Sequence, residues 1–372
     1  MNFSDLRTPG TVLTLQPDFF VLTDGTAKTV PSLLEGKVLA DATKVKVFID
    51  HETPCGSEKH AEWQKQLICF AKDHGCTLYN GYGTNYQLML EKEVQPGQVV
   101  AHCGDFGSVY GAANVLAVKL TPEALAEAMV SGSVEYTVPE SVFLKLEGEL
   151  RSPVCAKDAA IAALGLLGDT KGKLVYVSGA SALGSGAEVI AFFQLLSVSG
   201  CDAALPGNAG EAADLCLNLS EVVPMVAGPN DFSKVVPAAE LGEIPVTSVF
   251  IGGCSAGRIE DIRAAVQTLK DRRVLKTVRT MLAFASTDIY VQAANEGLIA
   301  RLMDAGILVM NQGCSGCYAH SQGLCDGEDT LLSTGSRACP NCREEGDIPT
   351  LLCSAATAIE SAIAGFVRPA VG

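Results

Sequence analysis

The sequence predicts an α/β protein with mainly parallel sheets. Short apolar runs that favour strands alternate with helical segments, and clear helix-end signals separate the two kinds of element. This alternation is typical of parallel strands joined by crossover helices. The main strand candidates are residues 44–50, 98–106, 173–179, 248–254 and 278–286.

The helix candidates are supported by residues that cap helix ends. Thr121 and Pro122 have the types expected at an N-cap and a first helical position, opening a helix over 121–132. Several candidates end in glycine, the usual residue after a helix. The other main candidates are 57–75, 257–273 and 287–306.

The length of 372 residues, 48% of them hydrophobic, is enough for two or three domains with a sizeable core. Residues 221–246 contain four prolines and no sustained periodicity, so we place the main linker there. A weaker boundary falls near 145–156. We therefore expect units at 1–145, 146–230 and 231–372.

The charge balance argues against nucleic acid as a partner. There are 42 acidic and 27 basic residues, and the net charge of -15 repels a phosphate backbone. No apolar run approaches the ~20 residues of a spanning helix, and the N-terminus has no signal-like pattern. We expect a cytoplasmic protein without a membrane partner.

Three of the 14 cysteines follow predicted strands. Cys254 follows 248–253, and Cys314 and Cys317 follow the apolar run 306–310. Because ligands of α/β sheets gather beyond the carboxyl ends of strands, these thiols can share one crevice. Taken alone, a C-x-x-C pair leaves zinc, a redox dithiol, two unrelated buried thiols and an iron–sulfur cluster all open.

The cysteine segments resemble those of the aconitase and 3-isopropylmalate dehydratase family. "FIGGCSAGRIEDIRAA" (250–265) is similar to the family segment in which a glycine-preceded cysteine leads into a helix, and "NQGCSGCYAH" (311–320) to its C-x-x-C loop. The resemblance spans roughly 44–372. Further matching stretches are 49–54, 95–117, 327–343 and 354–366.

This resemblance implies three-layer α/β/α domains with a cluster crevice between them. It also implies a [4Fe-4S] cluster held by Cys254, Cys314 and Cys317, so that the third unit carries most of the ligands. One iron is then free to bind a substrate hydroxyl and carboxylate. The implied activity is a hydro-lyase acting on a small hydroxy di- or tricarboxylic acid such as a 2-alkylmalate.

The resemblance also assigns catalytic and substrate-binding residues. Asp50 and His51 match the family's acid–base pair, and Asp105 is a further catalytic match; from the residues alone, Asp50 and His51 are equally consistent with a pair that caps a turn. The arginines suit bidentate carboxylate binding, with a surface ion pair as the alternative for Arg337. The implied substrate-binding residues are Arg258, Arg337, Arg343, Ser108 and Gln194.

Several positions depart from the family pattern. Phe106 and Gly107 stand where serine and histidine are expected, Tyr86 replaces another histidine, and Val198 replaces a glutamate. Cys339 and Cys342 form a second C-x-x-C. With Cys325 it is interpreted as a zinc site, as thiols that redirect cluster ligation, or as spare thiols of a cysteine-rich loop. His320 is a possible extra ligand or proton donor, or a loop histidine facing solvent.

The family's swivelling domain, which supplies a serine base and more arginines, has no match in this sequence. We therefore expect a separate small subunit that carries this domain and closes the site. Two other functions stay open: a catalytically altered binding or regulatory protein on the same scaffold, and a zinc-stabilised α/β protein.

Overall fold

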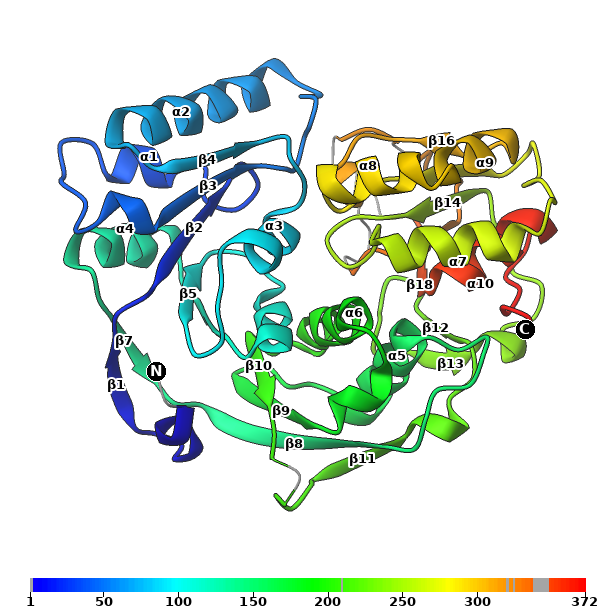
Figure 1. The fold of residues 1–372 in the computed structure, drawn as a ribbon, viewed down its shortest axis with the longest axis horizontal. Helices are drawn as coiled ribbons and strands as arrows, with labels where there is room; N and C mark the ends of the chain where they lie inside the picture. Colours follow the sequence, from blue (N-terminus) through cyan, green and yellow to red (C-terminus); the bar gives the residue numbers. More distant parts are fainter. Residues whose placement is uncertain (1–2, 209, 319–320, 324, 337–347) are drawn as a thin grey trace.

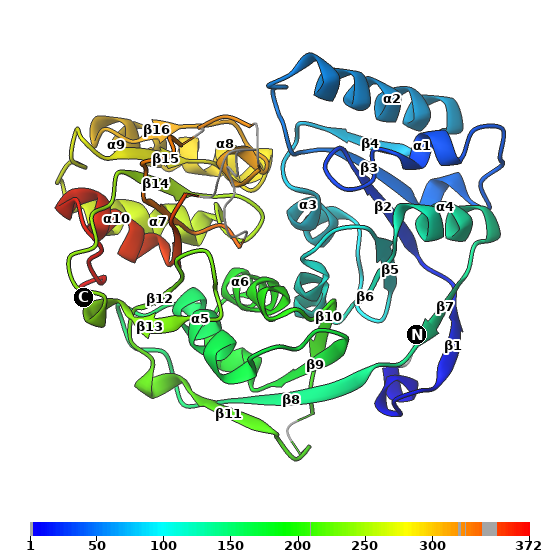
Figure 2. The same cartoon turned by 180° about the vertical axis from the view of Figure 1, so that it is seen from behind.

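The computed structural model describes residues 3–208, 210–318, 321–323, 325–336 and 348–372. In these ranges three larger sheets are each covered by helices, and an antiparallel ribbon pairs β1 with β7 (Val12–Leu15 and Val134–Thr137). The first and third sheets lie on opposite sides of the molecule, and the second lies between them along one edge (Figures 1 and 2). The predicted α/β class with mainly parallel sheets is confirmed.

The first sheet is parallel throughout, in the order β4-β3-β2-β5-β6. Side chains alternate between its faces: Phe20 and Leu22 pack toward α1, α2 and α4, whereas Val21 faces α3 and the second sheet. Its strands are Phe19–Thr23 (β2), Val45–Ile49 (β3), Thr77–Asn80 (β4), Val99–His102 (β5) and Leu116–Lys119 (β6). Its helices are Val30–Leu33 (α1), Glu58–His74 (α2), Asn85–Lys92 (α3) and Pro122–Ser131 (α4).

The second sheet is also parallel, in the order β10-β9-β8-β11. One of its faces packs on α5 and α6 through an apolar core. The strands are Glu140–Glu147 (β8), Lys173–Ser178 (β9), Ala203–Pro206 (β10) and Leu215–Asn218 (β11). The helices are Ala156–Leu167 (α5) and Gly186–Leu196 (α6).

The third sheet has the order β13-β12-β18-β17-β14-β15-β16. Its strands from β18 to β16 are parallel, and β12 runs antiparallel to β13 and β18 at one edge. The strands are Met225–Ala227 (β12), Val235–Pro237 (β13), Ser248–Ile251 (β14), Arg279–Leu282 (β15), Leu308–Val309 (β16), Leu331–Ser333 (β17) and Thr350–Cys353 (β18). The helices are Ile259–Leu269 (α7), Thr287–Asn295 (α8), Leu298–Asp304 (α9) and Ala355–Ala364 (α10).

Short 3-10 helices occupy several connections. They are η1 (Phe3–Arg7), η2 (Ala42–Lys44), η3 (Gly107–Ala113), η4 (Ala180–Leu183), η5 (Ser197–Ser199), η6 (Leu219–Glu221), η7 (Ala238–Glu240) and η8 (Ser315–Cys317). Among the described residues, no helix is long and apolar enough to cross a membrane.

The predicted elements differ from the observed ones in two instructive places. The helix expected over 287–306 is two helices, because Gly297 between α8 and α9 has a φ of +70° that ends the first helix. The expected linker 221–246 contains β12 and β13, which form the antiparallel edge of the third sheet. Strands β8 and β12 open the second and third sheets at residues 140 and 225, and the expected boundaries near 145 and 230 stay predictions.

Close packing between η3 and the second sheet depends on Gly111. A Cβ at this residue would lie 2.2 Å from the backbone oxygen of Ala204. Gly111→Ala should therefore lower the free energy of unfolding by about 1–3 kcal/mol, because the backbone must shift to make room. Urea denaturation measures this loss.

Gly186→Ala is the matched control, since a Cβ at this exposed first residue of α6 meets nothing within 4 Å. It should leave stability unchanged or slightly higher. Equal stability of the two variants would contradict the packing described for Gly111.

Candidate active site

A pocket lies where loops from the first and third sheets meet. Its lining comes from β2 and β5, from the start of α3, and from the loops that follow β2, β3, β5, β14 and β16, so it lies at the carboxyl ends of parallel strands from both sheets. The space inside is about 520 Å³, including the part open to solvent. The lining includes Cys254, Cys314, Cys317, His51 and Asp105, which were predicted from the sequence.

His51 is the titratable side chain at the end of β3. Its Nδ1 lies 2.7 Å from Asp50 Oδ1 and 3.1 Å from Asp24 Oδ1. Both contacts use Nδ1, so Nε2 is the ring nitrogen available to a ligand. Tyr318 packs edge-on against the ring with 4.6 Å between centroids. Gly25 makes room for the imidazole, because a Cβ there would lie 2.3 Å from Nε2.

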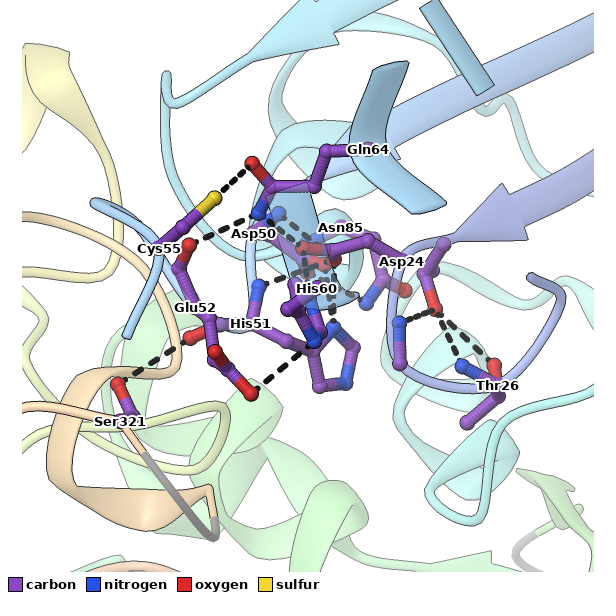
Figure 3. A network of polar contacts seen from close by, with 12 residues as sticks. Asp24, Thr26, Asp50, His51, Glu52, Cys55, His60, Gln64, Asn85 and Ser321 are labelled. Carbon is purple, nitrogen blue, oxygen red and sulfur yellow. Dashed lines mark hydrogen bonds and ion pairs between the residues drawn. The ribbon is translucent and has the colours of Figure 1, made fainter. Parts of the chain in front are cut away.

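Asp24 organises a buried polar network behind His51 (Figure 3). Its carboxylate accepts hydrogen bonds from the backbone N–H groups of Asp50 and His51, from His60 Nε2 at 3.0 Å and from Gln64 Nε2 at 2.8 Å. On the far side of His60, Nδ1 lies 3.0 Å from Glu52 Oε1. The network thus alternates carboxylates and imidazoles, Asp50, His51, Asp24, His60 and Glu52, in that order.

The pKa values in this network follow from burial and charge. Burial disfavours the imidazolium of His51, but the charges of Asp50 and Asp24 and their hydrogen bonds outweigh it and raise its pKa to about 10. Burial would raise the pKa of Asp24, but hydrogen bonds from His51 and His60 and the charge of His51 hold it well below its usual value. His51 is therefore protonated at neutral pH and is suited to donate a proton.

The three predicted cysteine ligands are all buried and line the same pocket. The Cys314 amide donates to the backbone oxygen of Asp50 at 2.8 Å, which joins the cysteine loop to the His51 loop. Glycines surround Cys317: a Cβ at Gly253 or Gly335 would lie 3.1 Å or 2.8 Å from its Sγ. The backbone can therefore approach the sulfur closely, as groups around an iron–sulfur centre do.

A mixed ligand set is the competing metal site in this region. Single ligand atoms of Asp50, His51 and Cys314 lie within 4.8 Å of one another. However, Asp50 Oδ2 already accepts from the backbone and side-chain nitrogens of Asn85 at 2.7 and 2.8 Å, and its Oδ1 contacts His51. The hydrogen bonds of Asp50 and His51 thus favour an acid–base pair over metal ligation.

Arg258 and Gln194 form a buried contact outside the pocket lining. Arg258 Nη2 donates to Gln194 Oε1 at 2.9 Å, and its Nε donates to Gln87 Oε1 at 2.8 Å. Within the described residues, Arg258 Nη1 and Gln194 Nε2 are buried without a hydrogen-bond partner. Two unpartnered donors beside a buried cation are suited to an anion.

The remaining predicted residues occupy different places. Asp105 lies at the pocket edge, where its carboxylate contacts Lys119 Nζ at 3.5 Å. Ser108 is outside the pocket lining, and its hydroxyl donates to the Phe193 backbone oxygen at 2.6 Å. Cys325 is buried in a small apolar cluster with Phe250 and Cys317. The positions outside the described residues are Arg337, Arg343, Cys339, Cys342 and His320.

Sequence reasoning missed several lining or supporting residues. Asp24 and His60 had no motif of their own, although Asp24 ends a strand-like run, which is a signal for this edge of a sheet. Tyr86, noted only as a departure, lines the pocket and accepts from the Phe106 amide at 3.1 Å. His102 also lines the pocket, and burial, aided by Lys119, lowers its pKa to about 4.

The chain is similar to several known proteins. The Aconitase family model (aconitate hydratase) matches residues 230–365. The homoaconitase large subunit of Thermus thermophilus is 30% identical over 350 residues, which cover 87% of this chain and 84% of that protein. The chain belongs to the aconitase family.

Other members of the aconitase family match over similar lengths. The 3-isopropylmalate dehydratase large subunit 2 of Archaeoglobus fulgidus is 27% identical, over 96% of this chain and 94% of that protein. The crystal structure of Thermococcus kodakaraensis aconitase X in its holo-form has a TM-score of 0.55 at 9% identity, covering 87% of this chain and 84% of that chain, and it supports the fold. The protein is thus a hydro-lyase of the aconitase family.

Replacing Asp24 tests the network behind His51. Asp24→Asn turns an acceptor oxygen into a donor facing other donors, and it leaves His51 and His60 short of a carboxylate. The variant should lose about 3 kcal/mol of unfolding free energy at neutral pH, as buried charge pairs do when one partner is removed. Chemical denaturation at several pH values measures this.

The sign of the pH dependence follows from the lowered pKa of Asp24. Its stabilising contribution is present above the unfolded pKa of about 3.9 and is lost as the pH falls through the lower folded pKa. The difference in unfolding free energy between wild type and Asp24→Asn should therefore become smaller at acidic pH. Asp73→Asn, on the exposed face of α2, is the control and should change stability by less than about 0.5 kcal/mol. A difference in unfolding free energy between wild type and Asp24→Asn that grows at acidic pH would contradict the lowered pKa of Asp24.

Proposed function

We propose that this chain is the large subunit of an iron–sulfur hydro-lyase that dehydrates a small hydroxy di- or tricarboxylic acid such as a 2-alkylmalate. The observation that carries the proposal is the convergence of Cys254, Cys314 and Cys317 with His51 in one pocket. The named relatives, a homoaconitase and 3-isopropylmalate dehydratases, support this class of substrate.

The residues present fit a [4Fe-4S] cluster with three protein ligands. Thiolates are the ligands that such clusters prefer, and Gly253 and Gly335 leave room beside the Cys317 sulfur. Cys254, Cys314 and Cys317 would hold the cluster. When bound, it supplies an iron without a protein ligand, which polarises the carbon–oxygen bond of the substrate hydroxyl.

His51 supplies the proton for the departing hydroxyl in this proposal. Asp50 and Asp24 hold its Nδ1 and keep the ring charged, so Nε2 can donate its proton into the pocket. The products are then water and an alkene acid, once a base has removed the proton from the neighbouring carbon. We assign that base to the small subunit, because the resemblance places it on the swivelling domain.

The described residues supply some of the groups that could bind the substrate carboxylates. Arg258 and Gln194 offer buried donors, and Thr23, Thr26 and Asn85 give the pocket lining polar character. Arg337 and Arg343 stay predicted carboxylate ligands. The relatives named as large subunits support a separate small subunit that completes the site.

Anaerobic iron and sulfide reconstitution tests the proposal. The wild-type chain should become brown, with acid-labile sulfide, and should dehydrate members of a 2-alkylmalate panel once a small subunit is added. Cys254→Ala should lose most of its bound iron and all measurable turnover, because one of the three thiols is gone. Iron and sulfide analysis and absorbance of the product's double bond give the readouts.

Cys69→Ala is the control, since Cys69 is exposed on α2 and lies outside the pocket lining. It should match wild type in both readouts. A colourless wild type that binds zinc without sulfide would favour the zinc-stabilised alternative. A brown wild type that turns over no hydroxy acid with its subunit would favour a binding or regulatory protein, for which Tyr86 and Phe106 in the pocket are the motivating departures.

A further inference from the structure

Lys157 is a buried lysine at the second position of α5 whose role is not explained by the proposed chemistry. Only 2% of the residue is exposed, and burial lowers its pKa. A positive charge near a helix N-terminus opposes the helix dipole, and burial of an ammonium carries a large desolvation penalty. A residue with these costs needs a compensating role.

The ammonium of Lys157 is bonded to neutral oxygens from two loops of the third sheet. Nζ donates to the backbone oxygen of Ser255 at 2.8 Å and to that of Thr334 at 2.5 Å, and it lies 3.4 Å from Ser255 Oγ. Ser255 Oγ in turn donates to the Thr334 oxygen at 2.8 Å. The side chain therefore ties the loop after β14 to the loop after β17.

Both loops shape the surroundings of the cysteines. Ser255 follows Cys254 directly, and Cys254 Sγ lies 3.3 Å from Ser336 Oγ in the other loop. Gly335, next to Thr334, approaches the Cys317 sulfur closely. The Gly252 amide also donates to Thr334 Oγ1 at 2.9 Å, which adds a second tie between the same loops. A change in the spacing of these loops would therefore move the Cys254 thiol and alter the packing of Gly335 against the Cys317 sulfur.

We propose that Lys157 is a positioning residue that fixes the Cys254 loop against the 333–336 loop, and so holds the thiols of Cys254 and Cys317 in place for the cluster. This inference rests on the proposed function, because a cluster gives the thiol arrangement its purpose. Lys157 lies on α5, which covers the second sheet. Its hydrogen bonds therefore also connect the loops after β14 and β17 to the second sheet's helices.

Thiol alkylation of the cluster-free full-length chain tests the proposal without any turnover. Lys157→Met keeps an unbranched side chain that is one heavy atom shorter and removes the Nζ donors. Iodoacetamide should label Cys254 and Cys317 about tenfold faster in this variant, since a lost hydrogen bond to a charged group is worth at least about one power of ten. Peptide mass spectrometry gives the rate at each cysteine, and Lys157→Arg should fall between the two.

Cys201, buried in the core of the second sheet, is the internal control for unfolding, and Lys46→Met is the matched variant at a buried lysine paired with Glu93. Cys201 should be labelled at the wild-type rate in Lys157→Met. Cys254 and Cys317 should be labelled at the wild-type rate in Lys46→Met. After reconstitution, Lys157→Met should also release iron to a chelator faster than wild type, while its thermal midpoint is equal or higher, because the desolvation penalty of a buried charge is gone.

Wild-type labelling of Cys254 and Cys317 in a folded Lys157→Met variant would overturn the proposal. If that variant does not fold, Lys157→Arg decides instead: labelling of Cys254 and Cys317 faster than in wild type supports the tie, and unchanged labelling overturns it. A wild type that takes up no iron and sulfide refutes the proposed function and, with it, the cluster role of Lys157, while faster labelling would still show the loop tie on its own.

Discussion

The structure depends on the meeting of two sheets, the first and the third, at the carboxyl ends of their parallel strands. The first sheet brings His51 and Asp50 to this edge and the third brings the cysteines, and the hydrogen bond from the Cys314 amide to the Asp50 oxygen at 2.8 Å connects the two. Gly313 permits this contact, because its φ is +122° and a Cβ there would lie 2.8 Å from the Asp50 oxygen. His51 and the three cysteines can thus line one pocket only while this hydrogen bond between the two loops is kept.

Much of the fold followed from periodicity and cap residues. The predicted bounds of strands such as Val45–Ile49 and Ser248–Ile251 lie close to the observed ones, because an apolar run followed by a glycine or charged residue is a strong local signal. The break at Gly297 and the edge strands in 221–246 were missed. The first depends on one backbone angle and the second on partners distant in sequence, and neither leaves a local pattern.

Site residues that belong to a sequence motif could be predicted, whereas those brought to the site only by tertiary packing could not. Cys254, Cys314, Cys317 and His51 lie in recognisable segments, and the structure brings them together in the pocket lining. Asp24, His60 and Lys157 act through contacts between residues far apart in the sequence. Asp24 and His60 are 36 residues apart and Lys157 and Thr334 are 177 apart, and a single sequence does not reveal such pairs. Ser108 shows the reverse case, since its place in a matching segment predicted a substrate contact and its hydroxyl bonds to the Phe193 backbone.

Two departures from the family pattern lie on the side of the pocket formed by the first sheet. Tyr86 and Phe106 stand where histidine and serine were expected, and both line the pocket, whereas the cysteine side keeps its motifs. Burial raises the pKa of Tyr86, so this side chain is neutral and offers a hydroxyl in place of a titrating imidazole. The cysteine motifs of the family are thus kept, whereas the side of the pocket formed by the first sheet carries altered side chains.

Anomalous X-ray diffraction at the iron edge, from crystals of the anaerobically reconstituted chain, tests the shared pocket most directly. The account predicts one iron-rich peak in the pocket, bonded to the sulfurs of Cys254, Cys314 and Cys317, with a corner that faces His51. Iron bound at a different place, or a peak that reaches only Cys314 together with Asp50 and His51, would contradict it.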